Sequence, residues 1–179
     1  MTWEPEIQEL QHRLELARRM GGEENIKRQH AGGKLTVRER IDRLVDPGSF
    51  EETGALAGTA DYDEQGNLVG FRPSNFVMGF ARIDGRLVVV GGDDFTVRGG
   101  AADASIGGKQ GYAEKMAREM QVPMIRLVDG TGGGGSVRTL DTIGRTYVPA
   151  NPAWDTVVEM LDEVPVVAAP GRAAPLGSK

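Results

Sequence analysis

Short apolar runs and glycine-rich stretches alternate along the second half of the chain. The apolar runs occupy residues 87–90, 123–128 and 164–169, and a helix-like segment, 112–120, separates the first two. Strand-like runs joined by a helical segment are typical of a βαβ unit. The pattern therefore predicts an α/β fold built from βαβ units.

The first half of the chain opens on a helical stripe. Apolar residues recur at spacings of three and four, which predicts a helix over 5–20 that ends at Gly21-Gly22. The stripe consists of Ile7, Leu10, Leu14 and Ala17. Such a face either packs against its own domain or binds a partner, and the spacing leaves both possibilities open.

Capping and turn motifs predict further helices and hairpins. Thr36 and Glu39 form a capping-box pattern that predicts a helix over Val37–Leu44. Residues 76–83 are strand-like, and Asp84-Gly85 is a two-residue turn that leads into the run 87–90. Residues 63–67 predict another hairpin tip, and 153–161 a late helix.

Glycines follow the predicted strands. Pairs occur at Gly91-Gly92 and Gly99-Gly100, and a longer run lies within 130–135. In open α/β layers, ligands bind at the carboxyl ends of strands, and glycine lets backbone N–H groups approach an anion. The same glycines are equally compatible with plain flexible loops.

Length, net charge and amino-acid composition exclude several classes of function. The chain has 179 residues, a net charge of −5 and no cysteine. These values indicate a globular protein with a real core and argue against nucleic-acid binding, disulfides and thiolate chemistry. The sequence shows no membrane span or signal peptide, so a cytoplasmic location is expected.

One region is basic within this acidic chain. Residues 27–43 carry six positive side chains against two negative ones, and Lys34, Arg38 and Arg40 are the candidate ligands for phosphate groups. A solvated helix with local ion pairs is the alternative.

The sequence contains few patterns of side chains that are typical of catalytic sites. The two histidines, His12 and His30, show no metal-binding spacing, and no metal site is expected. No Ser-His-Asp or P-loop pattern occurs. Backbone donors at strand ends remain, and they suit stabilisation of an oxyanion such as an enolate.

Long motifs resemble a known family. Residues 33–52 resemble the opening of the carboxyltransferase β subunits of biotin-dependent acyl-CoA carboxylases, of the propionyl-CoA carboxylase kind. Residues 94–100 are similar to its Asp-Phe-Thr-Val-Phe-Gly-Gly, and 123–133 to its strand ending in Asp-Ser-Gly-Gly-Ala-Arg. Residues 164–167 resemble the strand before its oxyanion loop.

This resemblance implies a crotonase-like α/β fold, here apparently truncated, with residues 1–50 as a helical segment and 51–179 as part of the acyl-CoA-binding domain. It implies transfer of a carboxyl group from carboxybiotin to an acyl-CoA through an enolate. The implied partners are acyl-CoA, a biotin carboxyl carrier or biotin carboxylase subunit, and further carboxyltransferase subunits in an oligomer. The partner protein would carry the biotin.

The resemblance also assigns residues. Gly99 and Gly100 would line the CoA loop, Gly132, Gly133, Gly134 and Gly135 would border the cleft, and the amides of Leu176 and Gly177 would hold the enolate. The family's arginine after the glycines is missing, and Pro175 stands where glycine is usual. A single-domain crotonase-like hydratase, decarboxylase or thioesterase, using Asp94 or Asp129, is one alternative. An inactive CoA-binding or assembly subunit is another.

Overall fold

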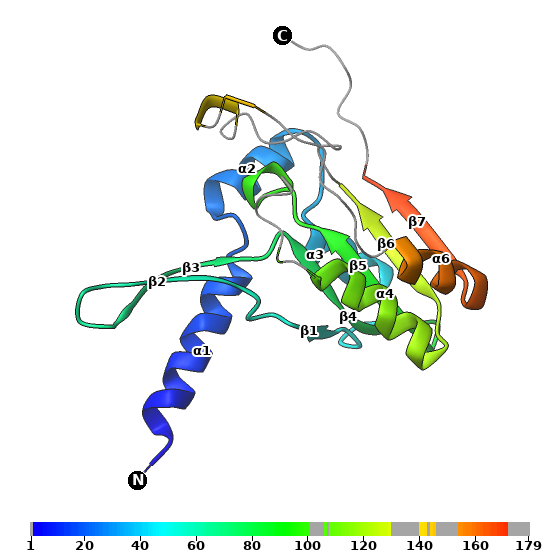
Figure 1. Cartoon of the computed structure of the whole chain (residues 1–179), viewed down its shortest axis with the longest axis horizontal. Helices are drawn as coiled ribbons and strands as arrows, with labels where there is room; N and C mark the ends of the chain where they lie inside the picture. Colours follow the sequence, from blue (N-terminus) through cyan, green and yellow to red (C-terminus); the bar gives the residue numbers. More distant parts are fainter. Residues whose placement is uncertain are drawn as a thin grey trace.

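A computed structural model describes residues 2–100, 106, 108–129, 140–142, 144–145 and 154–171. Figure 1 shows a central sheet with helices on both faces, and a long helix and a hairpin that project from it. The helices are α1 (Glu4–Arg18), α2 (Glu23–Ala31), α3 (Val37–Leu44), η1 (Arg98–Gly100), α4 (Lys109–Met120) and α6 (Trp154–Glu163). The strands are β1 (Glu51–Thr53), β2 (Gly58–Tyr62), β3 (Leu68–Pro73), β4 (Phe76–Ile83), β5 (Arg86–Asp93), β6 (Met124–Val128) and β7 (Val166–Pro170).

The main sheet has the order β1-β4-β5-β6-β7. Strands β1, β4 and β5 pair antiparallel, whereas β5, β6 and β7 pair parallel. The chain runs from β5 through α4 to β6 and from β6 through α6 to β7. The predicted βαβ arrangement is therefore confirmed, and the carboxyl ends of β5, β6 and β7 meet at one edge of the sheet.

Two apolar clusters sandwich this sheet. Side chains alternate along β4, where Phe76 and Met78 enter the cluster beneath α4 and α6, and Val77 faces α3. Helix α3 contributes Val37 and Ile41 to the second cluster. This alternation is the period of two that a strand imposes, and it fixes the register of β4 and β5 against both helical layers.

The predicted β4–β5 hairpin is confirmed, with Asp84 (φ 49°) and Gly85 (φ 76°) at its turn. The predicted hairpin tip at 63–67 joins β2 and β3. Helix α2 and strand β1 were not among the predicted elements.

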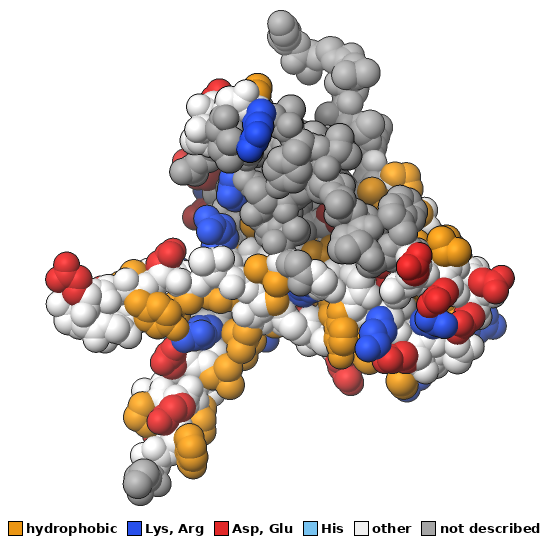
Figure 2. Space-filling view, in the orientation of Figure 1, with side chains coloured by type: hydrophobic (Ala, Val, Ile, Leu, Met, Phe, Trp, Pro, Cys, Tyr) orange, Lys and Arg blue, Asp and Glu red, His pale blue; other side chains and the backbone are white. Residues whose placement is uncertain are grey.

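The stripe on α1 has two environments. Ala17 is buried against the body of the protein, whereas Ile7 and Leu10 are 45% and 46% exposed on the projecting half of the helix. Figure 2 shows apolar side chains along this arm. Packing against the chain's own body thus accounts for the carboxyl-terminal end of the stripe, and its amino-terminal end stays available for a partner.

Helix α3 begins at the predicted capping box. Thr36 Oγ1 accepts from the Glu39 amide at 3.3 Å, and Glu39 Oε2 accepts from the Thr36 amide at 2.7 Å. Thr36 is buried. This cap sets the direction in which α3 crosses the sheet and delivers Val37 to the core.

Replacing Thr36 with alanine should reduce the free energy of unfolding by about 1–2 kcal/mol, because the Glu39 amide loses its acceptor. Urea denaturation followed by circular dichroism measures the loss. Thr36→Ser keeps the hydroxyl and should cost less than the alanine variant. Equal losses in the two variants would show that the methyl group, and not the cap, provides the stabilisation.

No helix in the described part of the chain is long and apolar enough to cross a membrane.

Candidate functional site

A tight turn follows β5 at the carboxyl edge of the sheet. Asp94 is buried and its Oδ1 accepts from the Thr96 amide at 3.0 Å and from Thr96 Oγ1 at 2.5 Å. Burial raises the pKa of the Asp94 carboxyl, and the bonds from Thr96 oppose that rise. Arg98, Gly99 and Gly100 then follow with φ of 52°, 64° and 69°. Three successive left-handed residues, of which two are glycines, turn the backbone sharply here.

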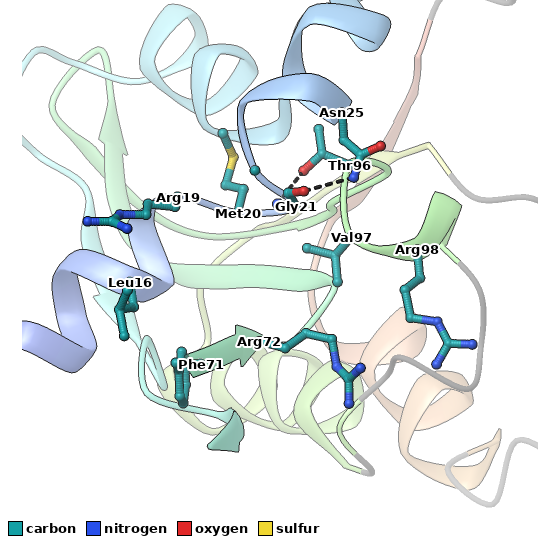
Figure 3. A pocket seen from close by; sticks show the side chains of 11 residues that line it. Leu16, Arg19, Met20, Gly21, Asn25, Phe71, Arg72, Thr96, Val97 and Arg98 are labelled. Carbon is teal, nitrogen blue, oxygen red and sulfur yellow. Dashed lines mark hydrogen bonds between the residues drawn. The ribbon is translucent and has the colours of Figure 1, made fainter. Parts of the chain in front are cut away.

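The junction of α1 and α2 rests directly on this turn. The Gly21 amide donates to Thr96 Oγ1 at 3.0 Å, and Asn25 Nδ2 donates to the Gly21 carbonyl at 2.8 Å. Figure 3 shows both bonds. A Cβ on residue 21 would lie 1.8 Å from the Thr96 carbonyl oxygen. Only glycine permits this approach, so the sequence requires Gly21 for the contact itself.

Two adjoining cavities flank the turn. The first cavity, of about 460 Å³, is lined by Asn25, Arg28, Gln29, Gly32, Lys34, Phe95, Thr96, Arg98 and Gly99. The second cavity, of about 310 Å³, is lined by Leu16, Arg19, Met20, Gly21, Gly22, Asn25, Phe71, Arg72, Thr96, Val97 and Arg98. They share Asn25, Thr96 and Arg98.

Charge distinguishes these cavities from the rest of the protein. The described lining residues include five cationic side chains and no acidic one, namely Arg19, Arg28, Lys34, Arg72 and Arg98. The chain as a whole carries a net charge of −5. A concave, positively charged surface in an acidic protein concentrates anionic ligands.

Lys34 is held in place by the end of β6. Its Nζ lies 2.9 Å from Asp129 Oδ1 and 5.0 Å from the centre of the Phe95 ring. Gln29 Nε2 donates to the other oxygen of Asp129 at 2.8 Å. The Asp129 amide in turn donates to Asp93 Oδ2 at 3.1 Å. The carboxyl ends of β5 and β6 therefore fix the position of Lys34 at the first cavity.

The other two predicted phosphate ligands have partners within the chain. Arg38 makes a two-pronged ion pair with Glu52, at 2.7 and 3.0 Å. Arg40 donates to the carbonyl oxygens of Ala169 at 2.6 Å and Val128 at 3.4 Å. Neither arginine is among the residues that line the first cavity. The structure thus ties Arg38 to β1 and Arg40 to the ends of β6 and β7.

Lys109 is a further buried cation, beside the Arg38–Glu52 pair. Its Nζ donates to the Gly54 carbonyl at 2.9 Å. Burial lowers the pKa of Lys109 to about 8, and the positive charge of Arg38 adds to this while Glu52 opposes it. This lysine joins the start of α4 to the segment after β1.

The predicted residues divide into three groups. Gly99 and Lys34 line the first cavity, and Gly100 follows Gly99 in the same turn. Arg38 and Arg40 lie elsewhere, as described above. The remaining candidates lie outside the described residues, namely Gly132, Gly133, Gly134, Gly135, Leu176 and Gly177.

Sequence reasoning did not single out Arg19, Arg28, Arg72 or Arg98 as site residues. Arg98 carried a usable signal, since it stands where the family motif has phenylalanine. Arg28 lay inside the basic region. Arg19 and Arg72 reach the cavity from α1 and β3, and nothing in their local sequence indicates that meeting. Among the described residues, no group of three or more His, Asp or Glu side chains could hold a metal ion.

Comparison with known proteins identifies the family. The carboxyl transferase domain model matches residues 28–157. The propionyl-CoA carboxylase beta chain of Cereibacter sphaeroides is 38% identical over 130 residues, which is 70% of this chain and 25% of that protein. The methylmalonyl-CoA decarboxylase subunit alpha of Veillonella parvula is 33% identical over 145 residues, or 79% of this chain and 28% of that protein. The chain spans about a quarter of the length of these relatives.

Solved structures of similar proteins support the same family. A transcarboxylase 12S structure with methylmalonyl-coenzyme A and methylmalonic acid bound is 26% identical, with a TM-score of 0.67 over 95% of this chain and 32% of the other. These neighbours have the crotonase-like fold, which confirms the predicted fold class. The resemblance seen in the motifs is also confirmed. The chain therefore belongs to the carboxyl transferase domain family.

Proposed function

We propose that this chain is the acyl-CoA-binding N-terminal part of an acyl-CoA carboxylase carboxyltransferase. Its reaction would transfer a carboxyl group from carboxybiotin to the α-carbon of an acyl-CoA through an enolate. The observation that carries the proposal is the first cavity, which places cations and the Gly99 backbone at the carboxyl end of β5. The names of the relatives support the substrate class.

The first cavity has the chemistry of a phosphate site. Arg28, Lys34 and Arg98 line it, and charge-assisted hydrogen bonds from such groups to phosphate are the strong kind. Its volume of about 460 Å³ falls within the range of small-molecule sites. We therefore place CoA phosphates there, with Gly99 and Gly100 as the backbone of the loop. Arg38 and Arg40 would act indirectly, by holding α3 against the sheet.

The chain's role in the chemistry would be to hold the thioester and stabilise its enolate. Two backbone amides aimed at the thioester oxygen meet that need. We propose the amides of Leu176 and Gly177, with residues 132–135 along the cleft. Biotin, carried by a partner protein, supplies the activated carboxyl group. The first cavity is lined by cations suited to phosphate and not to the neutral biotin ring, so we assign none of its residues to biotin.

Assembly with other subunits is part of the proposal. The partners would be a biotin carboxyl carrier or biotin carboxylase subunit and further carboxyltransferase subunits. Transcarboxylase 12S is described as a hexamer. The exposed side chains Ile7 and Leu10 on the projecting arm are consistent with a covered position in an oligomer.

Decarboxylation is the second candidate, because relatives include methylmalonyl-CoA decarboxylase alpha subunits. Loss of the carboxyl group from a malonyl-type thioester passes through the same enolate. The same cavity and donors would serve both directions. Supplying methylmalonyl-CoA or propionyl-CoA to the assembled enzyme, and following which of the two is consumed, distinguishes the candidates.

Lys34→Gln and Arg28→Gln should each weaken CoA binding by roughly tenfold, because each removes a charge-assisted bond to phosphate. Isothermal titration of the purified chain with CoA measures the effect. The loss should shrink as salt rises, since ions screen these charges.

Arg43→Gln is the matched control, because Arg43 is an exposed cation of α3 that lines neither cavity. It should leave CoA affinity unchanged. Unchanged affinity in both cavity variants at low salt would contradict the proposal. Equal losses in all three variants would show a general charge effect without a defined site.

A further inference from the structure

The second cavity, unlike the first, has a largely apolar group of lining residues beside its cations. One part is apolar, formed by Leu16, Met20, Phe71 and Val97. The remainder is cationic, with Arg19, Arg72 and Arg98. A ligand that contacts both parts would combine an apolar body with negative charge.

The positions of the side chains separate these two parts. In Figure 3, Arg72 and Arg98 extend in the same direction beyond Val97, whereas Leu16 and Phe71 lie together on the other side. The close-up also shows Arg19 directed away from Arg72. The side chains of Arg19 and Arg72 have no ion-pair or hydrogen-bond partner among the described residues. Their charges are therefore available to a ligand.

We propose that the second cavity binds a phosphorylated nucleoside. The base lies on the apolar floor against Phe71, and the phosphates lie between Arg72 and Arg98. Aromatic rings and guanidinium planes both stack on bases, and guanidinium groups match the geometry of phosphate. The cavity volume of about 310 Å³ is at the small end of ligand sites and suits a single nucleotide.

Two sources could supply this chemistry. One is the 3′-phosphorylated adenosine end of CoA, and this source alone rests on the proposed function. The other is a free nucleotide that acts as an effector. Because the cavities share Asn25, Thr96 and Arg98, a nucleotide in the second cavity would lie beside a ligand in the first.

Titration of the purified chain with adenosine 3′,5′-bisphosphate tests the proposal. Arg72→Gln should weaken binding by roughly tenfold, through loss of a charged donor to phosphate. Phe71→Leu keeps an apolar side chain but loses the aromatic face. It should weaken the bisphosphate about fivefold or more and leave inorganic pyrophosphate unchanged.

Arg86→Gln is the control, because Arg86 is an exposed arginine at the opposite end of β5. It should bind the bisphosphate like the unaltered chain. Circular dichroism of each variant identifies any loss that comes from unfolding, and the exposed position of Arg72 makes Arg72→Gln the decisive variant.

The outcomes separate the sources and the two proposals. Competition between CoA and the bisphosphate, with weaker binding of dephospho-CoA, assigns the cavity to CoA. Binding of ATP that CoA does not displace assigns it to an effector. Bisphosphate affinity unaltered by Arg72→Gln, or no greater than that of pyrophosphate, overturns the inference. The proposed function would still stand if Lys34→Gln weakened CoA binding.

Discussion

Replacing Gly21 with alanine should disrupt both cavities and destabilise the protein. The new Cβ would lie 1.8 Å from the Thr96 carbonyl oxygen and 2.9 Å from the Val97 nitrogen. These are backbone atoms of the turn after β5, so they cannot rotate aside as a side chain could. Either the junction of α1 and α2 separates from the turn or the turn itself moves. The free energy of unfolding should fall by about 3 kcal/mol or more, at the upper end of overpacking effects.

Gly21→Ala should also weaken ligand binding, because two residues that bond to Gly21 line both cavities. Asn25, which bonds to the Gly21 carbonyl, and Thr96, which accepts from the Gly21 amide, line both cavities. Gly21→Ala should therefore weaken CoA and adenosine bisphosphate together by more than tenfold, whereas Lys34→Gln and Arg72→Gln should each affect mainly one ligand site. Thermal denaturation and titration on one preparation measure both effects.

Gly66→Ala provides the matched control. Gly66 lies at the tip of the β2–β3 hairpin with φ 83° and nothing within 4 Å of a built Cβ. It should cost about 1 kcal/mol, from the left-handed backbone alone, and leave both ligands unaffected. A Gly21→Ala variant as stable as Gly66→Ala, with normal binding, would disprove the close contact between Gly21 and the turn.

The central sheet was predictable because its signals are local and strong. Strand β4 matches the predicted range 76–83, and its turn residues Asp84 and Gly85 lie where expected. Helix α3 begins directly after its cap Thr36, as predicted, because capping boxes are formed by neighbouring residues. Apolar periodicity, turn chemistry and caps all lie within a few residues of the element that they determine.

Helix α2 and strand β1 depend on distant contacts instead. Helix α2 has the sequence EENIKRQHA, whose few apolar residues give no stripe to detect. It is anchored by Gln29, which is buried and bonded to Asp129, one hundred residues further along the chain. Strand β1 has three residues and exists through pairing with β4. Neither contact can be inferred from local pattern.

The basic side chains of the candidate site also could not be assigned from local sequence alone. Charge counting placed Lys34, Arg38 and Arg40 together, yet their partners are on different elements. Arg38 meets Glu52, and Arg40 meets the carbonyl of Ala169, 129 residues away. Of the three, Lys34 lines the first cavity. Charge indicates that a region is basic, but only the tertiary contacts show which cations face a ligand.

Lys34 and Asp129 should show strong energetic coupling, with opposite effects on ligand affinity. The side chain of Asp129 is 8% exposed and that of Lys34 20%, so removal of either charge leaves the other poorly solvated. Asp129→Asn should reduce the free energy of unfolding by about 2–3 kcal/mol. The asparagine oxygen can still accept from Gln29, so the change removes the charge and the oxygen that accepts from Lys34.

The same Asp129→Asn change should tighten CoA binding several-fold, because it removes the negative charge that is paired with Lys34 and releases Lys34 Nζ toward phosphate. Lys34→Met should lower stability by a similar amount but weaken CoA. Asp155→Asn, at an exposed acid on α6, controls for net charge and should change neither quantity.

The double variant Lys34→Met with Asp129→Asn decides between this account and simple damage to the fold. Replacing both members of this partly buried pair leaves no charge without its partner, so stability should recover to within about 1 kcal/mol of the unaltered chain. CoA affinity should stay as low as in Lys34→Met, because the cation itself is gone. Recovery of stability without recovery of affinity would show that Lys34 contributes separately to folding and to the ligand. Additive losses of stability would show that the two side chains are not coupled.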